Sequence, residues 1–259
     1  MFAGKLYITL ALLSLTCTAI CPAGYMHTRF AFCVVQVGLA TEFCEACELC
    51  SNYGKQRGQF VFLQGRSMLA IVSSLDMISV VWSGINALLG IPESRSAFGW
   101  QDIEPKMPVF IAEPSEFKWG SGQPDENGPY LVYNKSDDAM YDVPQKGLEP
   151  PGVTVLCEFG GLLPRYRWTQ RYDATYPKRF DNIIHPNPGL VGCPHETQAL
   201  TKIDCVRRCA LDITCRSVYF NGKEGKCVLM RHADSLLPQT IAQSQEDWSR
   251  FVRTKQTYP

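Results

Sequence analysis

Apolar residues recur with a strand-like or a helical period in several separate stretches of this sequence. Aromatic residues alternate with other residues between Cys21 and Cys33, which predicts a short hairpin closed by these two cysteines. The apolar run 153–157 predicts a buried strand. Thr41 is placed to cap a helix that continues to about Asn52, with glutamates near its positive end.

The last quarter of the chain combines a helix with a hairpin. Thr201 and Asp204 resemble a capping box that opens a helix ending near Leu211. Residues 215–220 and 226–230 are joined by a glycine-containing turn, which predicts two paired strands. This order of elements indicates a small helix-on-sheet module.

Two regions lack such periodicity. Residues 101–151 are rich in proline, glycine, aspartate and asparagine, and a long irregular loop in a compact domain is usually functional. Residues 162–192 are first basic and then rich in proline and glycine, which predicts a linker. We therefore expect one domain over residues 20–161 and a second over residues 193–259.

The first 19 residues have the layout of a secretory signal peptide. Lys5 precedes an apolar run, Leu6–Leu15, and small residues lead to a cleavage site after Ala19. The alternative, an uncleaved membrane anchor, is disfavoured because a span needs about 20 apolar residues. The later apolar segment Val80–Ile91 is also too short. We expect a secreted, extracellular protein without a membrane span.

Charge narrows the classes of partner. The chain has 25 basic and 25 acidic residues, so its zero net charge gives no whole-chain reason to expect nucleic acid or an anionic membrane as partner. The net charge differs, however, between the two halves of the chain. Residues 20–161 carry 9 basic and 16 acidic side chains, a net of −7, whereas residues 162–259 carry 15 and 9, a net of +6. The second half is a candidate site for a polyanion; docking on the acidic half and a solvated surface are the alternatives.

Twelve cysteines in a secreted chain indicate disulfides. Cys17 is lost with the signal peptide, which leaves an odd number, eleven. Cys44, Cys47 and Cys50 recur every three residues on the predicted helix, so one of them should anchor it to a distant segment. A metal site there is disfavoured because a fourth ligand is missing nearby.

Three short motifs, in order, resemble the C-type lectin-like domain over residues 21–161. They are Val81-Trp82-Ser83-Gly84-Ile85, Trp100-Gln101-Asp102 and Leu156-Cys157-Glu158. The resemblance implies an α+β, disulfide-stabilised fold of the family's long form, with the pairs Cys21–Cys33 and Cys50–Cys157. The family's second pair is absent, since Val132 and residues 143–145 stand in its place.

The C-terminal part is similar to the PAN/apple module, a small helix-on-sheet domain. The resemblance covers Cys193 to Arg253 and implies two disulfides. These are Cys205–Cys227 and Cys209–Cys215.

Gln123-Pro124-Asp125 is the candidate ligand-binding segment. In C-type lectins this order marks galactose-type sites, where the same side chains hold Ca²⁺ and hydrogen-bond sugar hydroxyls. The resemblance implies Gln123, Asp125 and Asp142 as calcium ligands, with Glu126 as a substitute. Glu126, Asn127 and Trp119 complete the implied carbohydrate site.

The departures from the family pattern weaken this site. Residues 128–132 offer no carboxylate, and Met140-Tyr141 stand where the family has Trp-Asn. Fewer anionic ligands bind calcium more weakly. The alternative interpretation of the segment is an ordinary turn, and of Trp119 a core residue.

The sequence has no catalytic constellation, so we expect a binding protein and not an enzyme. The four histidines are scattered, and Asp137-Asp138 is typical of a solvated turn. Asn134-Lys135-Ser136 predicts a glycosylation site. Two functions remain open: a secreted lectin that binds galactose-like sugars through calcium, and a calcium-independent module that binds an extracellular protein.

Three cysteines are left over by these resemblances, namely Cys44, Cys47 and Cys193. Either Cys44 pairs with Cys47 and leaves Cys193 free, or one helix cysteine bridges to Cys193 and clamps the modules together. One thiol stays unpaired in both cases. We therefore expect a disulfide-linked homodimer or a mixed disulfide with another chain.

Overall fold

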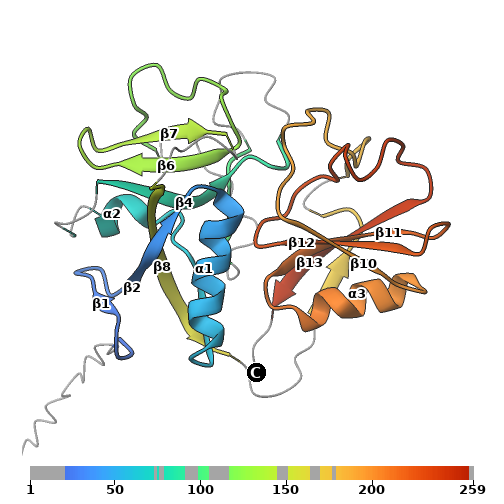
Figure 1. Cartoon of the computed structure of the whole chain (residues 1–259), viewed down its shortest axis with the longest axis horizontal. Helices are drawn as coiled ribbons and strands as arrows, with labels where there is room; N and C mark the ends of the chain where they lie inside the picture. Colours follow the sequence, from blue (N-terminus) through green and yellow to red (C-terminus); the bar gives the residue numbers. More distant parts are fainter. Residues whose placement is uncertain are drawn as a thin grey trace, which may run out of the picture.

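The computed structural model describes residues 21–72, 75, 79–90, 99–104, 117–144, 151–163, 170–176 and 179–256. Their strands form two sheets, each of which carries helices (Figure 1). The α+β architecture is as expected. The predicted signal peptide, with Cys17, lies outside the described residues. No helix among the described residues is long and apolar enough to cross a membrane.

The first sheet has the strand order β1-β2-β8-β4-β6-β7, with β3 paired to β8 and β5 to β4. Its eight strands are β1 (Met26–His27), β2 (Cys33–Ala40), β3 (Gln59–Leu63), β4 (Val80–Asn86), β5 (Gln101–Asp102), β6 (Tyr130–Asn134), β7 (Ala139–Val143) and β8 (Val153–Leu162). Two helices, α1 (Phe43–Lys55) and α2 (Met68–Val72), belong to this module. Strand β8 is longer than the predicted 153–157 and pairs with β2, β3 and β4.

Helix α1 begins and ends differently from the prediction. Its N-cap is Glu42, which makes no side-chain cap bond, and the helix continues three residues beyond Asn52. Thr41 instead donates its backbone N–H and its hydroxyl to the Glu45 carboxylate, at 3.0 and 3.3 Å. Thr41, the residue before the N-cap, therefore helps to fix the start of the helix.

The second sheet has the order β10-β12-β11-β13-β9. Its strands are β9 (Gln170–Asp173), β10 (Pro194–Gln198), β11 (Cys215–Asn221), β12 (Lys226–Arg231) and β13 (Trp248–Gln256). Helix α3 (Lys202–Leu211) is capped as predicted, because the Thr201 hydroxyl accepts the Asp204 N–H at 3.1 Å. Strand β9 lies inside the expected linker, so part of that segment is an edge strand of this sheet.

Five disulfides join ten of the eleven cysteines among the described residues. The four pairs implied by the two resemblances are present: Cys21–Cys33, Cys50–Cys157, Cys205–Cys227 and Cys209–Cys215. The fifth pair, Cys44–Cys193, joins α1 to the start of the second module. Of the two alternatives for the leftover cysteines, the structure has the bridge between modules.

Cys47 is the unpaired cysteine among the described residues, and it is buried. Its side chain is 1% exposed in the core of the first module. Burial raises the pKa of the Cys47 thiol far above its usual range, which keeps it protonated. Among the described residues, therefore, no exposed thiol is available for the intermolecular disulfide that we expected.

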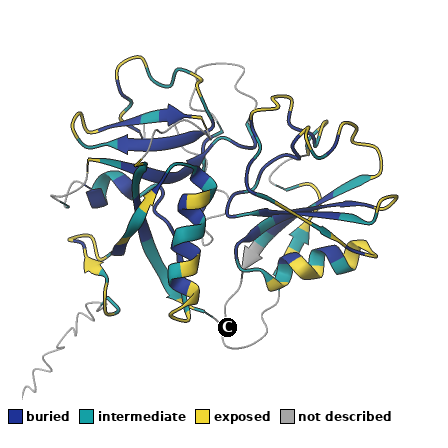
Figure 2. Ribbon diagram, in the orientation of Figure 1, coloured by how far each residue is buried: buried dark blue, intermediate teal, exposed yellow. Residues whose placement is uncertain are grey.

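A hydrophobic cluster of the first module extends into the second, which also has buried clusters of its own. Cys193 and Ala233 of the second module lie in the same buried cluster as Trp82 and Leu88 of the first. Figure 2 shows the buried stretches of both sheets converging where α1 lies between them. The chain therefore holds its modules by packing as well as by the disulfide.

Candidate functional site

The loop predicted to bind ligand folds against β7 of the first sheet. The Asp142 backbone N–H donates to the Gln123 side-chain oxygen at 3.0 Å. The buried Asp142 carboxylate accepts the N–H of Asp125 at 2.8 Å and that of Gly128 at 3.4 Å. The structure thus brings together Gln123, Asp125 and Asp142, as the resemblance implies.

A second set of bonds closes the loop on itself. Asp125 accepts the backbone N–H of Asn127 at 3.1 Å on one carboxylate oxygen and the side-chain amide of Asn127 at 2.5 Å on the other. The Gln123–Pro124 peptide is cis, and Glu126 has a left-handed backbone, φ 66°. Glu126 and Asn127 are exposed at the tip of the loop.

These oxygens do not form a calcium cage as they stand. Calcium takes about six to eight oxygen ligands, and here the oxygens of Gln123, Asp125 and Asp142 accept N–H groups of the loop and of β7. In the described part of the chain, no group of three His, Cys, Asp or Glu side chains is placed to hold a metal ion. Each of these three side chains already has a hydrogen-bond partner in the loop or on β7.

Burial also works against Asp142 as an anionic ligand. Burial is the largest effect and raises the pKa of the Asp142 carboxyl, and the charge of Asp125 raises it further. The backbone N–H groups of Asp125 and Gly128 offset part of this rise. Asp142 is best described as a buried brace for the loop.

Trp119 and Asn134 are two further predicted site residues, one bridged to Met140 of β7 and the other at the end of β6. The Trp119 ring is partly buried and packs 5.7 Å from the ring of Trp100 and 5.8 Å from that of Phe117. Its contacts are those of a core residue. Asn134 ends β6, and its side-chain oxygen accepts the N–H and the hydroxyl of Ser136 at 3.1 and 2.9 Å.

The junction between the modules holds a second group of polar residues, which the sequence analysis did not single out. Glu48 on α1 pairs with Arg231 at 3.1 Å and with His232 at 3.0 Å. Arg216 donates to the His232 carbonyl at 2.9 Å and to the carbonyl of Ile103. These contacts dock the basic second module onto the first.

The charges at this junction are strongly perturbed. The hydrogen bond from His232 is the largest influence on Glu48 and, against the effect of burial, lowers the pKa of Glu48 to about 2. Burial lowers the pKa of His232 below its usual value, although Glu48 opposes this. His232 is therefore neutral at pH 7 and donates to an ionised Glu48.

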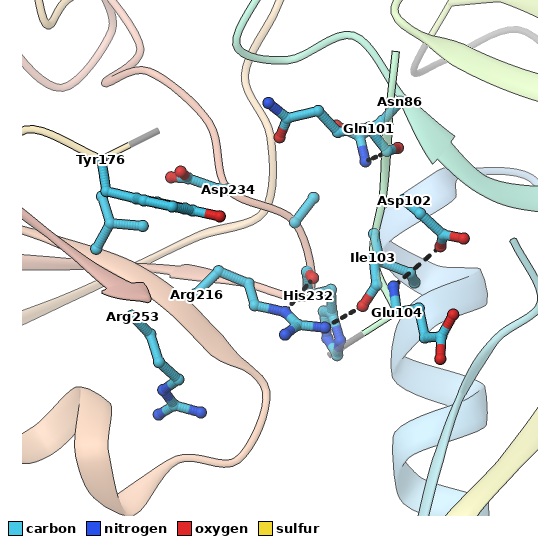
Figure 3. A pocket seen from close by; sticks show the side chains of 12 residues that line it. Asn86, Gln101, Asp102, Ile103, Glu104, Tyr176, Arg216, His232, Asp234 and Arg253 are labelled. Carbon is cyan, nitrogen blue, oxygen red and sulfur yellow. Dashed lines mark hydrogen bonds between the residues drawn. The ribbon is translucent and has the colours of Figure 1, made fainter. Parts of the chain in front are cut away.

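A small cavity of about 40 Å³ lies at the same junction (Figure 3). Tyr176 and Asp234 line it from the second module, and Asn86 and Gln101 from the first. The Tyr176 hydroxyl and one Asp234 oxygen are buried without a hydrogen-bond partner among the described residues. The cavity has room for water or one small polar group, since ligand pockets usually measure about 300–1,000 Å³.

No local sequence signal could have identified this cavity. Asn86 and Asp234 are far apart in the chain and belong to different modules. They meet only because the Cys44–Cys193 bridge and the hydrophobic cluster that extends across the junction fix one module on the other.

Comparison with known proteins identifies the second module. Residues 183–253 match the family model of the PAN domain. This match confirms the resemblance noted in the sequence, and it begins ten residues before Cys193. No curated protein matches the chain.

The first module resembles solved C-type lectin-like structures. They include human lithostathine (19% identity, 58% of this chain, 99% of that chain, TM-score 0.38) and the C-type lectin CEL-I from Cucumaria echinata (15%, 54%, 98%, 0.38). A calcium-independent type II antifreeze protein is also similar (15%, 55%, 95%, 0.36). At these TM-scores the likenesses assign no ligand to this chain.

Proposed function

We propose that this chain is an extracellular binding protein whose lectin-like module recognises a protein or glycoprotein ligand without calcium. One observation carries the proposal: the side-chain oxygens of Gln123, Asp125 and Asp142 are bonded to N–H groups of the loop and of β7. The recognition loop is thus pre-formed. Glu126 and Asn127 at its exposed tip are the groups left to meet a ligand.

The disulfides and the module types support the extracellular, non-enzymatic part of the proposal. Five disulfides among the described residues fit an oxidising compartment. Lectin-like and PAN modules are typically binding modules. The acidic character of the first module favours a partner with a basic surface.

Calcium titration tests the proposal. We expect the melting temperature of the purified chain to be the same in millimolar calcium and in excess chelator, because a ligand stabilises only the state that it binds. Calorimetry should show no calcium heat. The variant Asp125→Asn serves as a control, because it keeps one oxygen acceptor for the backbone N–H of Asn127 and removes one charge.

The competing function gives the opposite result. A galactose-type lectin would be retained on a galactose matrix, released by chelator, and stabilised by calcium in the unmodified chain but not in Asp125→Asn. That outcome would replace our proposal by calcium-dependent sugar binding.

A further inference from the structure

Helix α3 has an inner face fixed by two disulfides and an outer face on which exposed aliphatic side chains stand among charged ones. Cys205 and Cys209 are fully buried, and their disulfides fix the helix to β12 and to the start of β11. Ile203, Arg207 and Leu211 follow at intervals of four residues and form one ridge on the opposite side.

The apolar side chains on this outer side contribute little to the core. Ile203 is 80% exposed, Leu211 is 77% exposed, and Leu200, just before the helix, is 95% exposed. A helix packed on a sheet normally turns polar residues outward. Figure 2 shows the outer side of α3 exposed, and α3 packs on β11 and β12 of its own sheet. Two exposed aliphatic side chains on the helix, and a third just before its cap, point to a partner.

The same surface is positively charged. Lys202 and Arg207 are exposed and form no ion pair with the described residues, whereas Arg208 is paired with Asp204 at 3.1 Å. The module to which they belong has a net charge of +6 over residues 162–259. Exposed aliphatic side chains interspersed with cations that form no ion pair with the described residues suit an anionic partner.

We propose that α3 is a docking surface for an anionic lipid bilayer. Leu200, Ile203 and Leu211 insert between the headgroups, and Lys202 and Arg207 contact lipid phosphates. The helix is held in shape by its two disulfides and its Thr201 cap before it meets the membrane. The proposal is independent of the calcium-free recognition loop.

A lipid surface fits these observations better than a protein partner. A ten-residue helix is about 15 Å long, and a standard protein interface buries about 800 Å² on each partner. Three aliphatic side chains interrupted by Arg207 do not form a continuous patch of that size. Interfacial binding needs only a few inserted side chains and nearby cations.

Vesicle co-sedimentation of the full oxidised chain tests this inference. We expect binding to vesicles of phosphatidylcholine with phosphatidylserine, and little binding to phosphatidylcholine alone. The double variant Ile203→Ser/Leu211→Ser should bind at least about tenfold more weakly, because it loses inserted apolar surface while its charges stay. Leu162→Ser is the matched control, since Leu162 is a 68% exposed leucine in the first module.

Two results would overturn the proposal. One is no binding to the anionic vesicles at low salt. The other result has three parts. Ile203→Ser/Leu211→Ser binds the vesicles as well as the unmodified chain does, whereas Lys202→Ser/Arg207→Ser loses vesicle binding. The unmodified chain and Ile203→Ser/Leu211→Ser are retained equally on heparin. That result would assign the surface to a polyanion such as a sulfated glycan. Unchanged thermal melting of each variant shows that the fold is intact.

Discussion

At the scale of single residues, His232 makes the junction sensitive to acid. Its Nε2 atom lies 3.0 Å from Glu48, and Arg231 and Asp212 are the other charged groups beside it. Burial keeps the pKa of His232 below the ordinary histidine value of 6.5, so the unfolded chain takes up a proton before the folded chain does. Stability is therefore lost as the pH falls below about 6.5.

Glu48 adds a second loss at lower pH. Its pKa is about 2 in the fold against an ordinary glutamate value of 4.5, so its stabilising effect is present above pH 4.5 and declines as the pH falls towards 2. In urea unfolding between about pH 7 and pH 5, His232→Gln, which keeps a donor for Glu48, should flatten the pH dependence. The exposed His195→Gln should leave it unchanged; equal slopes in all three proteins would exclude His232 as the cause.

Cys47 gives a second prediction at this scale. We expect its thiol to resist maleimide in the native oxidised chain and to react after denaturation, because it is buried and protonated. Mass spectrometry counts the modified thiols. Cys47→Ala should leave the chain monomeric on a non-reducing gel. If the unmodified chain forms a dimer that is absent in Cys47→Ala, the hypothesis of an intermolecular disulfide through Cys47 would be supported.

At the scale of elements, the two longer helices show how far local signals reach. Helix α3 begins where the sequence predicts because Thr201 and Asp204 are neighbours and bond to each other. Helix α1 departs from the prediction: its N-cap makes no side-chain cap bond, and its first residue, Phe43, stacks on Tyr130 of β6 at 4.3 Å. Tertiary packing accompanies its start where a side-chain cap is lacking.

At the scale of the whole molecule, the Cys44–Cys193 bridge couples the modules. It spans 149 residues, but Cys50–Cys157 already shortens the loop to about 40 residues. A chain-entropy model then predicts that the bridge stabilises the folded chain by about 4 kcal/mol. Cys44→Ala/Cys193→Ala should lower the free energy of unfolding by up to this amount, measured in urea under non-reducing conditions.

The control for this prediction is the bridge within the first module's hairpin. Cys21→Ala/Cys33→Ala removes a loop of 12 residues and should cost less, about 3 kcal/mol. If this control lowers the free energy of unfolding more than Cys44→Ala/Cys193→Ala does, then the packing between the modules, and not the bridge, couples them.

The sequence by itself determined the module order, four of the five disulfides and the residues of the loop. The module order follows from local patterns along the chain, and the four disulfides are those that the resemblances to the two families imply. The convergence of Gln123, Asp125 and Asp142 was also predictable from the family pattern.

Only the tertiary structure decided what those residues do. It showed that the loop oxygens bond to backbone N–H groups, that Cys47 is buried, and that Cys44 pairs with Cys193. It also placed strand β9 in the second sheet and formed the cavity beside Asp234. The physical reason is that burial and pairing between distant segments depend on how the modules pack, which residue spacing along the chain does not encode.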